Sequence, residues 1–70
     1  MRRHHVRSGT LASVGYDEDA RVLEIRFSNG TVYQYDAVPE PVYRSLMDAW
    51  SKGWYFSVAI REMYRARRIA

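Results

Sequence analysis

A hairpin signal near the middle of the chain constrains the fold more than any other feature. From residue 21 to 27 apolar and polar side chains alternate, which places Leu23, Ile25 and Phe27 on one face of a strand. The next three residues, Ser-Asn-Gly, are typical of a tight turn, and the stretch 31–35 is rich in residues that favour strands. This part of the chain is therefore predicted to be an antiparallel hairpin.

The length of the hairpin loop decides where two tyrosines point, and two registers are open. A loop of two residues pairs Ile25 with Gln34 and turns Tyr33 and Tyr35 toward the polar face. A loop of three residues, closed by Gly30 in a left-handed conformation, pairs Ile25 with Tyr33 and separates the apolar face from the polar one. Because a slip of one residue reverses every side chain, burial should select the register, and we favour the three-residue loop. The polar face would then carry Glu24, Arg26, Gln34 and Asp36.

The flanking segments predict one more strand and two helices. Residues 10–16 favour a first strand, which an acidic turn at 17–19 connects to the hairpin. Two prolines around Glu40 open a helix that is predicted to end at Gly53. Ser57 is predicted to cap a second, short helix. The apolar stripe of the first helix comprises Val42, Tyr43, Leu46, Ala49 and Trp50, with Met47 at its edge.

The predicted fold is α+β: a three-stranded antiparallel meander packed against one longer and one short C-terminal helix. With 70 residues, of which 47% are hydrophobic, the chain is expected to be a single folded domain over residues 1–70. Residues 1–7 show no periodic pattern and are predicted to be a flexible basic arm. Because no apolar run approaches the ~20 residues of a membrane span, and no apolar signal core opens the chain, we expect a cytoplasmic domain without a membrane partner.

Positive charge is concentrated at the two ends of the sequence. Ten of the 11 basic residues are arginine, and the formal net charge is +3. Residues 1–7 and 61–70 each carry +3, whereas the segment between them carries −3. Such a distribution suits a polyanion if the two ends meet in space, and solvated tails are the simpler interpretation.

An ordered series of short motifs resembles the KTSC domain family. The series is Val14-Gly15-Tyr16-Asp17, Leu23-x-Ile25-x-Phe27, Gly30, Tyr33-Gln34-Tyr35, Val38-Pro39, Val42-Tyr43, Ala49-x-Ser51-x-Gly53-x-Tyr55-Phe56 and Ile60-Arg61. Tyr33 and Tyr35 match the central Tyr-x-Tyr motif of that family. The resemblance implies a domain that occurs alone in bacterial and phage proteins and at the carboxyl end of some lysyl-tRNA synthetases. It further implies RNA binding, inferred from that attachment, with no catalytic residues and no cofactor.

Catalysis has little support in the residues themselves. The only histidines, His4 and His5, lie in the predicted arm and are adjacent, so on an extended segment they point to opposite sides. The acidic turn at 17–19 lacks the spacing of a calcium loop, and cysteine ligands are absent. No glycine-rich phosphate loop is present. We therefore expect no enzymatic activity, no metal site and no cofactor.

A nucleic acid, RNA in the first place, is the expected partner. Small domains stack unpaired bases on aromatic side chains beside arginines, and a guanidinium group both stacks and binds phosphate. For the two tyrosines, packing in the core is the competing interpretation, which the favoured register supports. The expected nucleic-acid-binding residues are Arg61, Arg65, Arg67, Arg68, Arg2, Arg3, Arg26, Tyr33 and Tyr35.

The alternative function is a module that binds a protein partner or forms a homodimer. Its expected binding residues are Trp50, Trp54 and Tyr55, because a core this small has little room for them and such residues dominate interface hot spots. Closing one end of the core is their simpler role. The salt dependence of binding distinguishes the two functions, because the affinity for phosphate falls steeply as salt rises and that of an aromatic interface barely changes.

Overall fold

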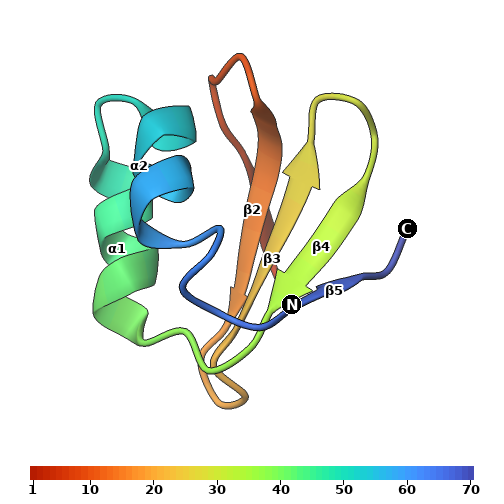
Figure 1. Ribbon diagram of the computed structural model, residues 1–70, viewed down its shortest axis with the longest axis vertical. Coiled ribbons are helices and arrows are strands. Elements are labelled where there is room, and N and C mark those ends of the chain that lie inside the picture. The colour runs from red at the N-terminus through yellow and green to blue at the C-terminus, as the bar shows by residue number, and fades with distance from the viewer.

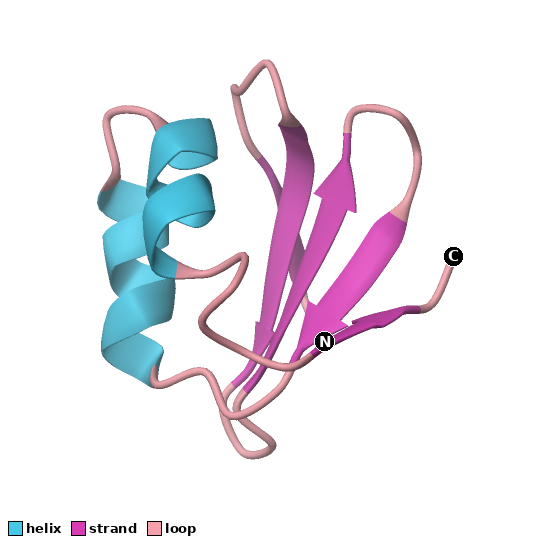
Figure 2. Cartoon of the chain, in the orientation of Figure 1, coloured by secondary structure: helices cyan, strands magenta, loops and turns pink.

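The computed structural model describes residues 1–70 as a five-stranded antiparallel sheet with two helices on one face (Figure 1, Figure 2). The strands lie in the sheet in the order of the sequence. They are β1 (Arg3–His5), β2 (Leu11–Asp17), β3 (Val22–Phe27), β4 (Val32–Tyr35) and β5 (Ala66–Arg68). The helices α1 (Glu40–Asp48) and α2 (Lys52–Ala59) lie between β4 and β5 in the chain. The predicted α+β class, with an antiparallel meander followed by helices, is confirmed.

The three-residue hairpin loop is also confirmed. Ile25 pairs with Tyr33, and Leu23 pairs with Tyr35. The backbone N–H of Gly30 donates to the carbonyl oxygen of Phe27 at 2.9 Å. Gly30 has φ of +92°, a conformation that favours glycine and closes this loop. Both tyrosines of β4 consequently face the helices.

Two short edge strands extend the predicted three-stranded meander to five. Residues 1–7, predicted to be a flexible arm, contain β1, in which Arg3 lies opposite Gly15 of β2. Near the other end of the chain, β5 places Arg67 opposite Gln34 of β4. Neither edge strand has an alternating apolar pattern, because its side chains are exposed. These strands form by satisfying backbone groups that β2 and β4 would otherwise leave unpaired.

The helices begin and end at different residues from those predicted. Helix α1 ends at Asp48, and α2 begins after Ser51, whose hydroxyl oxygen accepts a hydrogen bond from the Trp54 backbone N–H at 3.3 Å. Gly53, predicted to end the first helix, lies inside the second one, and so does Ser57. The cap at Ser51 starts the second helix six residues before the predicted serine, which shortens the first helix.

The position of Trp50 follows from this earlier break. Trp50 was predicted to belong to the buried stripe of the first helix, and that prediction was wrong. It lies in the connection between α1 and α2 and is fully exposed, with a relative accessibility of 101%. Because the chain leaves the helix after Asp48, the periodicity that would have turned Trp50 inward ends before it.

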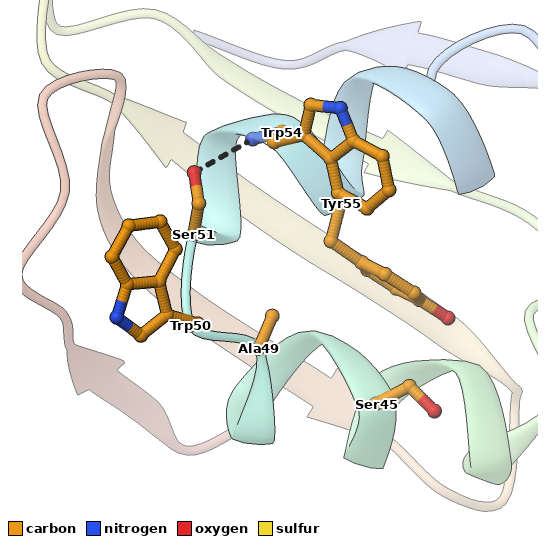
Figure 3. Close-up of a pocket in the computed structure, with 6 residues that line it drawn as sticks. All are labelled: Ser45, Ala49, Trp50, Ser51, Trp54 and Tyr55. Carbon is orange, nitrogen blue, oxygen red and sulfur yellow. Dashed lines mark hydrogen bonds between the residues drawn. The ribbon is translucent and has the colours of Figure 1, made fainter.

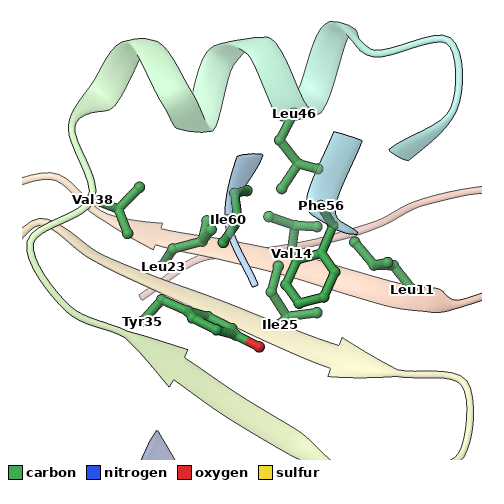
Figure 4. Close-up of a cluster of buried hydrophobic side chains, with 9 residues drawn as sticks. All are labelled: Leu11, Val14, Leu23, Ile25, Tyr35, Val38, Leu46, Phe56 and Ile60. Carbon is green, nitrogen blue, oxygen red and sulfur yellow. The ribbon is translucent and has the colours of Figure 1, made fainter. Parts of the chain in front are cut away.

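The core lies between the sheet and the two helices (Figure 4). It comprises Leu11, Val14, Leu23, Ile25, Tyr35, Val38, Leu46, Phe56 and Ile60. Tyr35 is only 3% exposed, so its ring packs as the favoured register predicts. One layer of helices on one face of the sheet leaves the other face without a covering helix.

Candidate nucleic-acid interface

A cleft of about 630 Å³ opens between the end of α2 and the edge of the sheet at β4 and β5. Four of its lining residues are aromatic: Phe27, Tyr33, Tyr35 and Phe56. Two more are arginines, Arg61 after α2 and Arg68 on β5. We call this site the tyrosine cleft, because the Tyr-x-Tyr pair of β4 forms its floor.

Edge-to-face contacts hold the rings of the tyrosine cleft in place. The ring centroid of Tyr35 lies 5.5 Å from that of Phe56, with an interplanar angle of 75°. Tyr33 meets Phe27 in the same way, at 5.9 Å and 79°. The two tyrosines share a face because they are two residues apart on one strand. Tyr33 is half-buried and the ring of Tyr35 lies deeper, so the cleft offers one accessible aromatic surface above a buried one.

The electrostatics of the tyrosine cleft favour an anionic partner. Burial raises the pKa of Tyr35 to about 12, with a further increase from neighbouring Tyr33, while the positive charge of Arg61 opposes the shift. The Tyr35 hydroxyl is therefore neutral at physiological pH. Neither Arg61 nor Arg68 forms a salt bridge with an acidic side chain, and no acidic residue lines the cleft. Arg68 Nε donates a hydrogen bond to the backbone oxygen of Ala70 at 3.1 Å.

On the opposite face of the sheet, two of the expected arginines neutralise carboxylates. Arg3 Nε donates to Glu24, which is 4% exposed, and Gln34 Nε2 donates to the other Glu24 oxygen at 2.9 Å. Arg67 donates two hydrogen bonds to the carboxylate of Asp36, of 2.7 and 3.2 Å. Burial alone would raise the pKa of Glu24, but the hydrogen bonds from Gln34 and Arg3 lower it below its usual value. Arg3 and Arg67 therefore secure the edge strands rather than offer free charges.

The remaining expected arginines do not join the cleft. Arg26 is exposed on β3 and points to the face opposite the helices, because it alternates with the core residue Ile25. Arg2 precedes β1, at the far edge of the sheet from β5. Arg65 precedes β5, and its carbonyl oxygen accepts from the Asp36 backbone N–H at 2.9 Å. The two basic ends of the sequence thus lie at opposite edges of the sheet and do not meet.

The structure therefore brings together four of the expected nucleic-acid-binding residues: Tyr33, Tyr35, Arg61 and Arg68. Phe27 and Phe56 also line this site, although neither was among the residues predicted to bind nucleic acid. Phe27 could have been found from the hairpin register, which places it diagonally from Tyr33. The place of Phe56 in the cleft depends on where α2 begins, and the sequence did not predict that boundary correctly.

The three expected partner-binding residues lie at a second site, between α1 and α2. A hollow of about 620 Å³ is lined by Ser45, Ala49, Trp50, Ser51, Trp54 and Tyr55 (Figure 3). Trp50 projects from the connection between the helices, and Trp54 projects from the first turn of α2 with 65% of its surface exposed. Tyr55 is half-buried and packs against the core. We call this site the tryptophan hollow.

The titratable residues form no metal-binding group. No cluster of three or more His, Cys, Asp or Glu side chains is present. His4 and His5 are both exposed on β1. Neither helix has the length and apolar character needed to cross a membrane.

These observations define a small α+β domain with an open aromatic cleft flanked by arginines. Residues 7–64 match the sequence model of the KTSC domain, and the chain belongs to this family. A crystal structure of a KTSC domain protein from Yersinia pestis is similar over 99% of this chain and 97% of that chain. Its TM-score is 0.93 and its sequence identity is 41%. The resemblance expected from the sequence motifs is confirmed.

Two further relatives differ in how much of them this chain covers. An uncharacterized protein of Stutzerimonas stutzeri (strain A1501) is 40% identical over 70 residues, which cover 99% of both chains. A lysine–tRNA ligase of Nostoc punctiforme is 33% identical over 60 residues. That match covers 86% of this chain but only 11% of the ligase. The same kind of domain therefore occurs as nearly a whole chain and as a small part of a longer one.

Proposed function

We propose that this KTSC domain is a small, non-enzymatic module of the cytoplasm that binds single-stranded RNA weakly in the tyrosine cleft. The observation that carries the proposal is the meeting of aromatic rings and two arginines in one open cleft that no carboxylate lines. A base stacked on an aromatic side chain contributes ~1–3 kcal/mol, and this contribution depends little on sequence. One or two such stacks with two phosphate contacts correspond to weak binding.

The depth of each side chain in the cleft suggests how a nucleotide would bind. Tyr33 is half-buried, so part of its ring is available to a base. Arg61 and Arg68 are exposed, where their guanidinium groups can reach phosphate oxygens. The Tyr35 hydroxyl, whose pKa is raised to about 12, stays uncharged and can donate a hydrogen bond without repelling phosphate.

A relative supports the same class of partner. The Nostoc punctiforme protein is named a lysine–tRNA ligase, and its name states that it acts on an RNA. The part of it that is similar to this chain is a minor fraction of its length. An accessory RNA contact is a function that a domain of this size could perform there.

The proposal is tested by titrating a labelled single-stranded RNA of mixed sequence and following its anisotropy at about 50 and 200 mM salt. Wild-type protein should bind more weakly at the higher salt. Arg61→Ala combined with Arg68→Ala should weaken binding and reduce the salt slope by about 1.4, because each lost phosphate contact on a single strand accounts for about 0.7.

The matched control is Arg26→Ala combined with Arg44→Ala, which removes the same charge from other surfaces. This control should bind almost as the wild type does. Absence of binding at the lower salt would refute the proposal. Equal losses in the two double variants would show that the cleft is not the binding site.

A second candidate function rests on the exposure of Trp50 and Trp54. Under this alternative, the tryptophan hollow docks a protein partner or a second copy of the chain. Light scattering over a range of protein concentrations would then show a dimer that high salt does not dissociate. The RNA titration would show no binding.

A further inference from the structure

A third hollow, of about 520 Å³, joins the tyrosine cleft to the tryptophan hollow. It shares Thr10 and Ser57 with the tyrosine cleft. It shares Trp50, Ser51 and Trp54 with the tryptophan hollow. We call it the connecting hollow. The three sites are therefore one continuous surface that passes around the beginning of α2.

Contacts between loops and helix hold the connecting hollow together. The Thr10 carbonyl oxygen accepts from the Ser28 backbone N–H at 2.8 Å, which ties the β1–β2 loop to the central hairpin. Gly53 of α2 lies so close to this loop that an added Cβ would come within 3.3 Å of the Thr10 hydroxyl oxygen. The β1–β2 loop, the hairpin loop and the connection between the helices lie at the same end of the molecule (Figure 1).

Basic residues line two of the three hollows, whereas the acidic residues nearest in sequence, Asp48 and Glu62, lie beside lining residues without lining a hollow themselves. Arg7 and Lys52 line the connecting hollow, as Arg61 and Arg68 line the tyrosine cleft. None of the chain's eight acidic residues lines any of the three sites. The acidic turn 17–19 lies at the opposite end of the molecule (Figure 1). Three other carboxylates, those of Glu24, Asp36 and Glu40, form salt bridges with arginines away from the hollows.

The order of side chains along the surface fits a single strand of nucleic acid. Aromatic rings lie at both ends, with Tyr33 in the tyrosine cleft and Trp50 and Trp54 in the tryptophan hollow. Between them lie hydroxyl groups and cations, which bind sugar and phosphate oxygens. Because arginine and aromatic residues also occur at protein interfaces, the absence of any lining carboxylate beside these cations is what favours a polyanion.

We propose that the three hollows form one track for a single strand of RNA, with bases stacked on Tyr33 at one end and on the tryptophans at the other. This inference rests on the proposed function, which it extends to Trp50 and Trp54. The longest dimension of the molecule is 28 Å. A straight path of this length corresponds to about eight nucleotides of a stacked strand, at about 3.4 Å per nucleotide.

The test compares RNA oligonucleotides of about three and about eight nucleotides, of which the first is below and the second within the usual range of single-strand sites. Anisotropy of a label on the RNA measures binding, and tryptophan fluorescence with the indole N–H resonances reports on the tryptophan hollow. Trp50 and Trp54 are the only tryptophans, so both signals come from this site. The longer RNA should quench the fluorescence and shift both indole resonances, whereas the shorter RNA should perturb mainly the tyrosine cleft.

Variants separate a stacking role from a structural one. Trp50→Ala combined with Trp54→Ala should lower affinity for the longer RNA about tenfold or more and leave the shorter RNA unaffected. Trp54→Phe should retain most of the affinity, because its ring still stacks. Met63→Ala, which removes another exposed apolar side chain, is the control for folding and surface effects.

The outcomes distinguish this inference from the function on which it rests. If both RNAs bind equally and neither the tryptophan signals nor the double variant respond, the tyrosine cleft remains the site and the track is refuted. If no RNA binds at either length, both proposals are refuted. A dimer that the double tryptophan variant dissociates, with unchanged RNA binding, would assign the tryptophan hollow to a protein interface and overturn the track.

Discussion

Tyr35 belongs to the core and to the candidate site at the same time. Its ring is 3% exposed and packs edge-on against Phe56, yet it also lines the tyrosine cleft. A residue in both places couples the stability of the fold to the shape of the cleft. The sequence could predict the packing from the hairpin register, but the cleft around Tyr35 also needs Phe56 and Arg61, which come from α2 and the segment after it.

The raised pKa of Tyr35 predicts a loss of stability at alkaline pH. Burial favours the neutral phenol, so the pKa is about 12 in the folded protein against 10.0 for the free side chain. Its stabilising contribution is complete below pH 10 and is lost as the pH rises toward 12, because the unfolded chain ionises first. We expect the wild type to lose about 2 kcal/mol more than Tyr35→Phe over this window. Urea unfolding at several pH values measures the difference, and parallel curves would contradict it.

At the scale of elements, hydrophobic alternation located β3, and residues that favour strands beside turn signals located β2 and β4. The edge strands β1 and β5 were not predicted from the sequence pattern, because all their residues are exposed and neither strand has a buried face. They are held by backbone pairing and by ion pairs such as that of Arg67 with Asp36, which joins residues 31 positions apart. Interactions over such distances leave no local periodic pattern in the sequence.

The helix boundary is a second limit of local reasoning, and it gives a test with a built-in control. Ser51 accepts a hydrogen bond from the Trp54 backbone N–H, whereas Ser57 lies inside α2 and has no capping role. Ser51→Ala should therefore destabilise the domain by about 1 kcal/mol, and Ser57→Ala by much less. Thermal or urea unfolding of both variants measures the contrast. A larger loss for Ser57→Ala would restore the helix boundary that the sequence predicted.

For the whole molecule, the fold rearranges the charge pattern of the sequence. The sequence is basic in residues 1–7, acidic in the middle and basic again in residues 61–70. In the fold, however, the two terminal strands lie at opposite edges of the sheet. The cations that line the tyrosine cleft and the connecting hollow come from a loop, the start of α2, the segment after it and β5. Local charge led to the expectation of a polyanionic partner, but it could not locate the cleft in which we propose that this partner binds. Location depends on which edge each terminal strand joins, and composition does not contain that information.

The last prediction separates a localised track from general attraction by net charge. Glu18→Gln combined with Asp19→Asn would raise the formal net charge from +3 to +5, at the end of the molecule away from the hollows. Exposed charges are screened beyond about 8 Å at physiological salt, so RNA affinity should rise less than about twofold. Anisotropy at that salt concentration, beside Arg61→Ala combined with Arg68→Ala, measures the two changes on one scale. If the acidic-turn variant strengthens binding as much as the arginine variant weakens it, affinity follows total charge and the cleft has no special role.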